Sequence, residues 1–204
     1  MDGYLAVLAC SPRTGGNSDA AARLFAQGAE QAGAEVRRAA LRDYRVLPCT
    51  GCGACAVPPH ACALARDDAA EELFGLCLEA SAVCIAAPIF FYHLPAPLKA
   101  WIDRGQSLYQ RREAGAPALA GLPRRPAYAC LVAGRPRGAQ LFSGSLLTLK
   151  YFFAPMNLDL AEPLAFRGID APGDLEADPA ACAALLAAGR AAGDLVARPE
   201  RELI

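Results

Sequence analysis

Four of the nine cysteines lie close together, at a spacing that could hold a metal centre. Cys49, Cys52 and Cys55 form a Cys-x-x-Cys-x-x-Cys run, and Cys62 follows after a gap of six residues. Thiolates at this spacing suit a cubane [4Fe–4S] cluster. Soft thiolate ligands also select zinc. A loop of reduced or oxidised thiols without metal is the third interpretation, and spacing alone leaves the three open.

A second segment, CSPRTGGNS at residues 10–18, could bind a phosphate. It combines hydroxyl and amide donors, a guanidinium with the two-pronged geometry that suits phosphate, and two glycines that allow close backbone approach. These residues are Ser11, Arg13, Gly15, Gly16, Asn17 and Ser18. The segment matches neither the Gly-x-Gly-x-x-Gly dinucleotide motif nor the Gly-Lys-Ser/Thr triphosphate loop. A plain strand-to-helix turn with Asn17 or Ser18 as helix N-cap is the simpler alternative.

Alternating apolar strands and helices must position these residues. Strands are predicted at 3–10, 34–42, 81–88, 124–133 and 157–166, and helices at 17–33, 67–80, 96–109, 138–154 and 178–197. Five such strands predict an α/β, doubly wound parallel sheet with helices on both faces. In this fold ligands bind at the carboxyl ends of the strands, so the phosphate segment lies at the expected site and leads into a helix N-terminus that favours anions.

Composition excludes several classes of protein. The chain has 204 residues, 54% of them hydrophobic, and a net charge of −1, which argues against nucleic-acid binding. The N-terminus lacks a basic leader, and the longest apolar stretch, 82–92, is too short for a bilayer, so we expect no membrane association and a cytoplasmic location. We expect one domain over 1–204 with a Cys-rich insertion at 42–66. The scattered cysteines are predicted to be core thiols: Cys10, Cys77, Cys84, Cys130 and Cys182.

Two segments resemble signatures of the flavodoxin-like NAD(P)H-dependent FMN reductase family. GYLAVLACSPRTGGNS at 3–18 is similar to the family's first strand and phosphate loop. AAPIFFYHLPAPLKAWIDR at 86–104 is similar to its second signature, in which a proline and an aromatic precede a helix carrying Lys and Asp-Arg. The resemblance covers most of the chain in order. It implies a five-stranded flavodoxin-like sheet of order 2-1-3-4-5, with the phosphate of FMN on the first loop.

The resemblance also implies which residues surround the flavin. Those that would wrap the ribityl chain and the ring are Pro88, Ile89, Phe90 and Phe91, and those that would contact the ring edge are Ala133 and Gly134. The family usually has a glycine pair at the last position, whereas this chain has one glycine followed by Arg-Pro-Arg. Arg135 or Arg137 could attract the phosphate of NADPH, or both could belong to a solvated basic loop.

Three further positions are interpreted as secondary. His93 could pass a proton to reduced flavin, although a lone loop histidine is more often solvated. Lys99 and Asp103 lie four residues apart on one predicted helix and can form an ion pair. Together with Arg104 they are interpreted as structural or as part of a subunit interface.

Three hypotheses for the function follow. The first is an FMN-dependent oxidoreductase that passes electrons from NAD(P)H to a small acceptor such as a quinone, a nitro compound or free flavin, with no catalytic acid or base from the protein. The second is an iron–sulfur flavoprotein, a branch of the same family with a compact four-Cys motif, which receives electrons from ferredoxin. The third is a non-enzymatic carrier like flavodoxin. The resemblance implies a homodimer or homotetramer.

Overall fold

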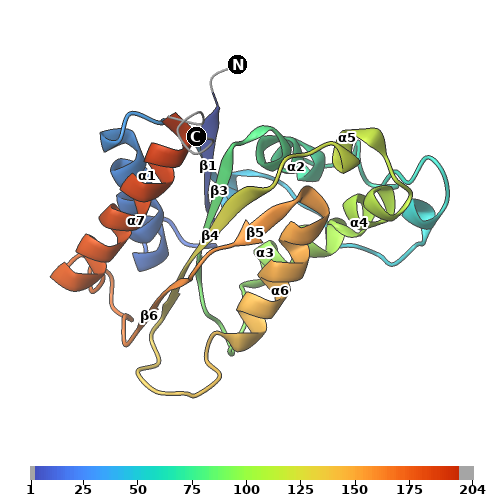
Figure 1. The fold of residues 1–204 in the computed structure, drawn as a ribbon. Helices are drawn as coiled ribbons and strands as arrows, with labels where there is room; N and C mark the ends of the chain where they lie inside the picture. Colours follow the sequence, from blue (N-terminus) through green and yellow to red (C-terminus); the bar gives the residue numbers. More distant parts are fainter. Residues whose placement is uncertain (1–2, 198–204) are drawn as a thin grey trace.

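The computed structural model describes residues 3–197 and contains a parallel sheet covered by helices on both faces (Figure 1). The strand order is β2-β1-β3-β4-β5, and β6 also pairs with β4. The strands are β1 (Tyr4–Ala9), β2 (Glu35–Ala40), β3 (Ala82–Pro88), β4 (Arg125–Ala133), β5 (Leu158–Leu160) and β6 (Leu164–Arg167). This order confirms the predicted flavodoxin-like fold.

The helices form two layers with separate cores. Helices α1 (Asn17–Gln31) and α7 (Pro179–Ala197) cover one face of the sheet, as Figure 1 shows. The other layer contains α2 (Ala70–Glu79), α3 (Ala96–Arg104), α4 (Gln106–Glu113), α5 (Pro117–Ala120) and α6 (Ser143–Phe153). Short 3₁₀ turns are η1 (Leu41–Asp43), η2 (Ala54–Ala56) and η3 (Ala154–Met156). Strands β1 and β3 are buried on both sides, as their continuous apolar sequences predict.

Two predicted elements are interrupted. The prediction of one strand over 157–166 is wrong, because the segment divides into β5 and β6 around Pro163, which has no N–H for a sheet hydrogen bond. The prediction of one helix over 96–109 is also wrong. Gly105 separates α3 from α4, where a Cβ would lie 2.9 Å from the Ile102 carbonyl oxygen. Helices α4 and α5 occupy part of the segment 112–126, which was expected to be a loop. Each of the other predicted helices and strands begins and ends within five residues of its predicted bounds.

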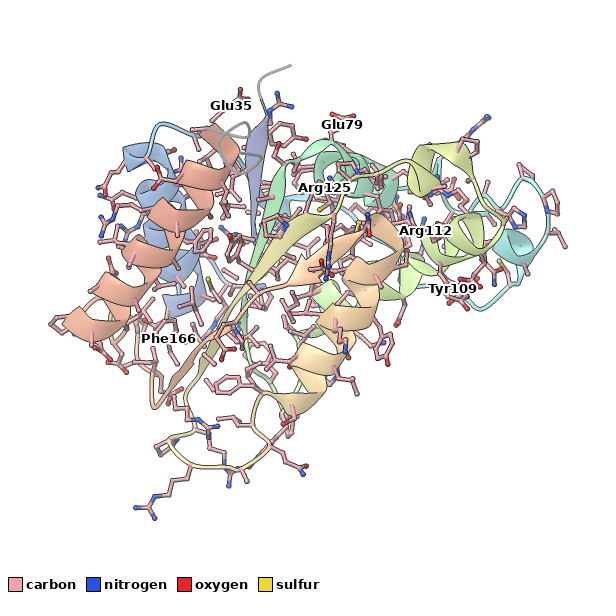
Figure 2. The ribbon with its side chains drawn as sticks, in the orientation of Figure 1. Glu35, Glu79, Tyr109, Arg112, Arg125 and Phe166 are labelled. Atoms are coloured by element: carbon pink, nitrogen blue, oxygen red, sulfur yellow. The ribbon has the colours of Figure 1, made fainter. Side chains whose placement is uncertain are left out.

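Buried Arg125, at the start of β4 (Figure 2), joins three elements and has no carboxylate partner among residues 3–197. Its guanidinium donates hydrogen bonds of 2.5–3.2 Å to the backbone carbonyls of Cys77, Leu78, Ala80 and Met156. Three of these acceptors are carbonyls at the end of α2, which have no partner inside the helix. Burial lowers the pKa of Arg125. This side chain therefore caps α2 and connects it to the turn before β5.

Small residues let α1 and α7 pack at close range. A Cβ on Gly189 would lie 2.0 Å from the carbonyl oxygen of Phe25, and one on Gly193 would lie 2.5 Å from that of Ala29. Among the described residues, α7 is the helix long and apolar enough to cross a membrane by length and composition. In this fold it lies along α1.

We expect Gly189→Ala to destabilise the protein by about 1–3 kcal/mol, because the added methyl group meets backbone that cannot move without separating the helices. Gly75→Ala in α2 is the matched control, since a Cβ there has no neighbour within 4 Å. That control should be neutral or stabilising by up to about 1 kcal/mol through helix propensity. Urea unfolding of both variants measures the difference, and equal effects would contradict the packing described for α1 and α7.

Candidate functional site

The first loop leaves β1 and presents backbone donors at the start of α1. The Cys10 N–H bonds to the Ala86 carbonyl at 2.8 Å, which fixes the loop beside the end of β3. Within the part of the chain that the structure describes, the N–H groups of Gly16, Asn17 and Ser18 have no acceptor. Unpaired N–H groups at a helix N-terminus form a site for an anion.

Arg42 and Asp19 brace this loop from outside, and the sequence pattern did not identify either residue. Arg42 Nη1 lies 3.1 Å from Asp19 Oδ1 and donates to the Ser11 carbonyl at 3.4 Å. The other carboxylate oxygen of Asp19 accepts the Gly15 N–H at 2.9 Å. An acidic residue in the first turn of a helix is a signal that could have indicated Asp19. Arg42 is 23 residues away in sequence and was not predictable.

Asn17 has a structural partner that the sequence did not suggest. Its Nδ2 donates to the Ala171 carbonyl at 2.8 Å, and its Oδ1 accepts the Leu175 N–H at 3.2 Å. The side chain therefore holds the segment 171–175 against the loop, and the helix N-cap is Gly16 rather than Asn17 or Ser18. Because its side chain is already paired, Asn17 can offer an anion only its backbone N–H.

A shallow cavity of about 380 Å³ lies at the carboxyl ends of β3 and β4. Its lining includes four of the residues expected around a flavin and three others: Ile89, Phe90, Phe91 and Ala133, together with Tyr92, Arg135 and Leu141. Pro88, the last residue of β3, pairs with Val132 in the register of β4. The cavity wall is thus formed where the two strands end.

A strained turn forms one side of this cavity. Phe90 and His93 pair through hydrogen bonds of 2.9 and 3.0 Å, and the two residues between them have positive φ angles, 50° for Phe91 and 64° for Tyr92. Left-handed conformations cost about 1–2 kcal/mol per non-glycine residue and concentrate at ligand-binding sites. The Phe91 ring is fully exposed beside the cavity.

Three neighbouring side chains lie differently from expectation. Gly134 packs against Asp170, where a Cβ would lie 2.4 Å from Oδ1, so this close approach explains the glycine. His93 Nε2 lies 3.2 Å from Thr148 Oγ1 on α6, which gives the histidine a protein partner instead of a solvated position. The Arg135 guanidinium lies 5.6 Å from the centroid of the Tyr92 ring.

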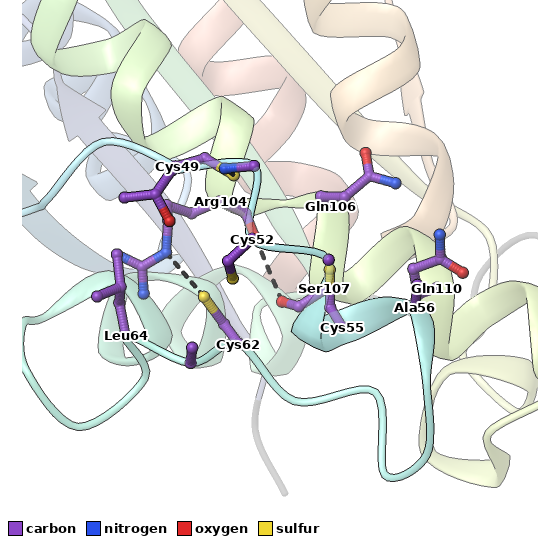
Figure 3. Close-up of a pocket in the computed structure, with 14 residues that line it drawn as sticks. Cys49, Cys52, Cys55, Ala56, Cys62, Leu64, Arg104, Gln106, Ser107 and Gln110 are labelled. Carbon is purple, nitrogen blue, oxygen red and sulfur yellow. Dashed lines mark hydrogen bonds between the residues drawn. The ribbon is translucent and has the colours of Figure 1, made fainter.

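The four clustered cysteines line one cavity of about 180 Å³ against α4 (Figure 3). Cys49 and Cys52 are exposed, whereas Cys55 and Cys62 are half-buried. The sequence-predicted set is therefore brought together in space. Among residues 3–197, no three His, Cys, Asp or Glu side chains are arranged to hold a single metal ion.

Arg104 and Asp68 form a buried ion pair beneath this cavity, and their side chains are 1% and 0% exposed. Arg104 Nη1 lies 2.5 Å from Asp68 Oδ2, and Arg104 Nε donates to Cys62 Sγ at 3.1 Å. Arg104 Nη2 is buried with no partner among the described residues. The structural role expected of Arg104 agrees with this ion pair, and its contact with Cys62, a candidate ligand, was not suggested by the sequence.

The surroundings of these groups shift their pKa values in different directions. Burial raises the pKa of the Cys55 thiol, and the neighbouring thiols of Cys62, Cys49 and Cys52 raise it further. The Ala54 N–H and the Thr50 hydroxyl lower the pKa of Cys52. Burial would raise the pKa of Asp68, but hydrogen bonds from Arg104 and two backbone N–H groups outweigh it and hold the pKa below its ordinary value.

The remaining cysteines lie outside both sites. Cys10, Cys77, Cys84 and Cys130 are buried as predicted, while Cys182 is only half-buried. Burial raises the pKa of Cys77 to about 12, so this thiol stays protonated and unreactive.

The two candidate sites are separate within one chain. In Figure 1 the Cys-rich segment lies beside α4, away from the loop that follows β4 at the carboxyl end of the sheet. The site residues predicted from sequence therefore form two groups, one at the sheet edge and one against α4.

Comparison with known proteins places the chain in a family. The family model for NADPH-dependent FMN reductase matches residues 4–149. Two similar proteins are named iron–sulfur flavoprotein. The one from Archaeoglobus fulgidus is 33% identical, and the match covers 46% of this chain and 41% of that protein. The one from Methanosarcina thermophila is 31% identical, and the match covers 50% of this chain and 51% of that protein. The chain therefore aligns with about half or less of each curated relative.

Solved structures share the fold. A flavone reductase superimposes with a TM-score of 0.68 at 14% identity, over 97% of this chain and 64% of that one. The NAD(P)H:quinone oxidoreductase from Methanothermobacter marburgensis superimposes with a TM-score of 0.64 at 17% identity, over 96% of both chains. At these identities the likeness shows the fold alone. Because the family model covers most of the chain, including β1, the first loop and β3, the chain belongs to the NADPH-dependent FMN reductase family of flavoprotein oxidoreductases.

Proposed function

We propose that this flavoprotein oxidoreductase binds FMN at the carboxyl edge of the sheet and an iron–sulfur cluster at the cysteine cavity, and so acts as an iron–sulfur flavoprotein. The single observation that favours the cluster is the hydrogen bond from buried Arg104 Nε to the sulfur of Cys62, one of four cysteines that line the same cavity. The names of the two sequence relatives support the same function.

The residues at the sheet edge fit FMN. Three unpaired N–H groups at the start of α1 and the exposed Arg13 suit a phosphate, and a Cβ on Gly16 would meet nothing within 4 Å, so space lies open in front of them. FMN, when bound, supplies transfer of a hydride or of single electrons. The proposed contacts are those expected from sequence: Ser11, Arg13, Gly16, Asn17 and Ser18 for the phosphate, and Pro88, Ile89, Phe90, Phe91, Ala133 and Gly134 for the ribityl chain and ring.

The protein's own groups bind and shield the flavin rather than move protons. Ile89, Phe90 and Phe91 would cover the ring with apolar surface and exclude water from one side. His93, the candidate proton donor, is engaged with Thr148 on α6. We therefore assign no catalytic acid or base.

The residues of the cysteine cavity fit a cluster. Cys49, Cys52, Cys55 and Cys62 supply four soft thiolate ligands, and Arg104 Nε donates a hydrogen bond to the sulfur of one of them, Cys62. Such a cluster, when bound, supplies one-electron transfer. A one-electron protein donor such as ferredoxin is then the proposed partner, and a small molecule such as a quinone, nitro compound or flavin the proposed final acceptor.

NAD(P)H as donor is the second candidate, favoured by the family description and by two exposed cations, Arg135 on the wall of the flavin cavity and Arg137 two residues further along the same loop. The family assignment favours an enzyme over a passive flavodoxin-like carrier. A homodimer or homotetramer stays a prediction, and a second subunit would cover the exposed ring of Phe91.

The cluster is tested by iron and acid-labile sulfide analysis of protein purified without oxygen. We expect about four iron atoms per chain, little iron in Cys62→Ser, and unchanged iron in the control Cys182→Ser, a half-buried thiol outside the cavity. Wild-type protein with FMN but no iron would overturn the cluster and leave NAD(P)H as the proposed donor. Reduction of the bound flavin by NADPH or by reduced ferredoxin, followed by absorbance, distinguishes the two donors.

Gly16→Ala gives a sharp test of the phosphate contact. Gly16 has an ordinary backbone conformation, with φ −81°, and open space around its Cβ position, so the apoprotein should stay folded and lose only about 1 kcal/mol, because alanine is a poorer N-cap than glycine. The methyl group would occupy space assigned to the phosphate, and we expect FMN affinity to fall about tenfold, about 1.4 kcal/mol. Titration of apoprotein by flavin fluorescence measures it. Unchanged affinity would place the phosphate elsewhere.

A further inference from the structure

Arg104 is more fully buried than its place at the end of a surface helix requires. Its side chain is 1% exposed, and its partners come from two segments of the Cys-rich insertion and its flank. Nη1 contacts Asp68 and the Leu47 carbonyl, at 2.5 and 3.1 Å, while Nε donates to Cys62 Sγ at 3.1 Å. Figure 3 shows the guanidinium directed at Cys62 on the wall of the cavity.

A purely structural ion pair does not account for this arrangement. Asp68 already accepts the Leu47 and Ala70 N–H groups at 2.7 and 3.0 Å, and pairing with Nη1 completes its surroundings. The contact of Nε with sulfur adds nothing to that pair. Nη2 is buried with no partner among the described residues, which is unfavourable for a side chain whose role is only structural.

We propose that Arg104 is a positioning residue for the cysteine site, which raises the reduction potential of the iron–sulfur cluster held by Cys49, Cys52, Cys55 and Cys62. The inference rests on the proposed function, because it assumes that the cluster is present. Net charge and hydrogen bonds to sulfur set the potential of such clusters. Reduction adds negative charge, so a fixed cation and N–H donors favour the reduced state.

Asp68 holds the Arg104 guanidinium in one position. The carboxylate holds the guanidinium plane from the side away from the sulfur, so the side chain does not need to reorient when the charge of the cluster changes. Asp68 also offsets part of the positive charge. The hydrogen bond from Nε to the Cys62 sulfur, rather than net charge alone, is therefore expected to carry the effect.

Potentiometric titration of protein purified without oxygen tests the proposal, with the reduced cluster followed by electron paramagnetic resonance. The main variant is the double substitution Arg104→Gln with Asp68→Asn, which removes both charges and leaves no unpaired ion. Arg104→Lys keeps the positive charge but loses the planar guanidinium with its several N–H donors. The control is Arg111→Gln on α4, since Arg111 pairs with Glu71 at 3.3 Å, is about one-third exposed and does not line the cavity.

We expect the double variant to keep its iron and to be reduced about tenfold less readily, a fall of about 59 mV for one electron, with the control unchanged. A loaded double variant with the wild-type potential would overturn the inference while leaving the cluster intact. Loss of iron from both Arg104 variants would also overturn it, because Arg104 would then serve assembly. Absence of iron from the wild type would instead contradict the proposed function.

Discussion

Arg104→Met is expected to lower the free energy of unfolding by about 3–5 kcal/mol, the largest stability effect that we predict. Methionine fills a similar volume, so the main consequence is electrostatic. Asp68, whose side chain is 0% exposed, would be left as a buried carboxylate without its cation. Urea unfolding of metal-free protein measures the loss, and a cost below about 1 kcal/mol would contradict the burial described for the pair.

The double variant Arg104→Met with Asp68→Asn should recover much of this stability, because no charge remains unpaired. Acid dependence gives a second readout. The pKa of Asp68 is lower in the folded protein than in the unfolded chain, so its contribution to stability is present above about pH 4 and is lost as pH falls further. Metal-free wild type should weaken more steeply than the double variant in that acid range, and identical pH profiles would argue against the pair.

Arg13→Ala is expected to raise the Kd for FMN about tenfold to a hundredfold. A charge-assisted hydrogen bond contributes about 1.5–3 kcal/mol, and each 1.4 kcal/mol is about a factor of ten in affinity. Arg13 is exposed on the first loop, and its backbone N–H bonds to Ser11 Oγ at 3.1 Å, which keeps the loop shape without help from the guanidinium. The substitution should therefore leave the fold intact.

The matched control is Arg23→Ala, which removes an exposed cation from the same helix that the first loop enters. Arg23 pairs with Glu176 at 2.5 Å, and both side chains are about half exposed, so its loss should not change FMN affinity. The difference between the two variants should shrink at high salt, since exposed charges are screened. Equal affinities at low salt would show that Arg13 does not contact the phosphate.

The strands and the first loop were predictable from local patterns, whereas the strand order was implied by the family resemblance. Continuous apolar runs identify strands buried on both faces, and the sequence Ser-Pro-Arg-Thr-Gly-Gly-Asn-Ser between such a strand and a helix predicts a phosphate site. The four cysteines were predictable from spacing for the same reason. Periodicity could not show that Pro163 would divide the last strand or that Gly105 would separate α3 from α4, where an added Cβ would lie close to the Ile102 carbonyl and the Phe152 ring.

Contacts between distant segments were not predictable. Arg104 and Cys62 are 42 residues apart, and the family signature that contains Arg104 suggested only a structural helix residue. Asn17 was assigned to the phosphate or to the helix cap because its position favours both, whereas its amide bonds to a segment more than 150 residues away. Side-chain types limit what each residue is able to do, and the tertiary fold determines which partner it meets.

The absorption spectrum of protein purified without oxygen tests most directly whether one chain holds both redox groups. The proposal predicts two flavin bands superimposed on a broad brown absorbance that dithionite bleaches and that disappears in Cys62→Ser while the flavin bands remain. Flavin bands alone, bleached by NADPH and unchanged in that variant, would contradict it. The chain would then be a simple FMN reductase whose four clustered cysteines carry no cluster.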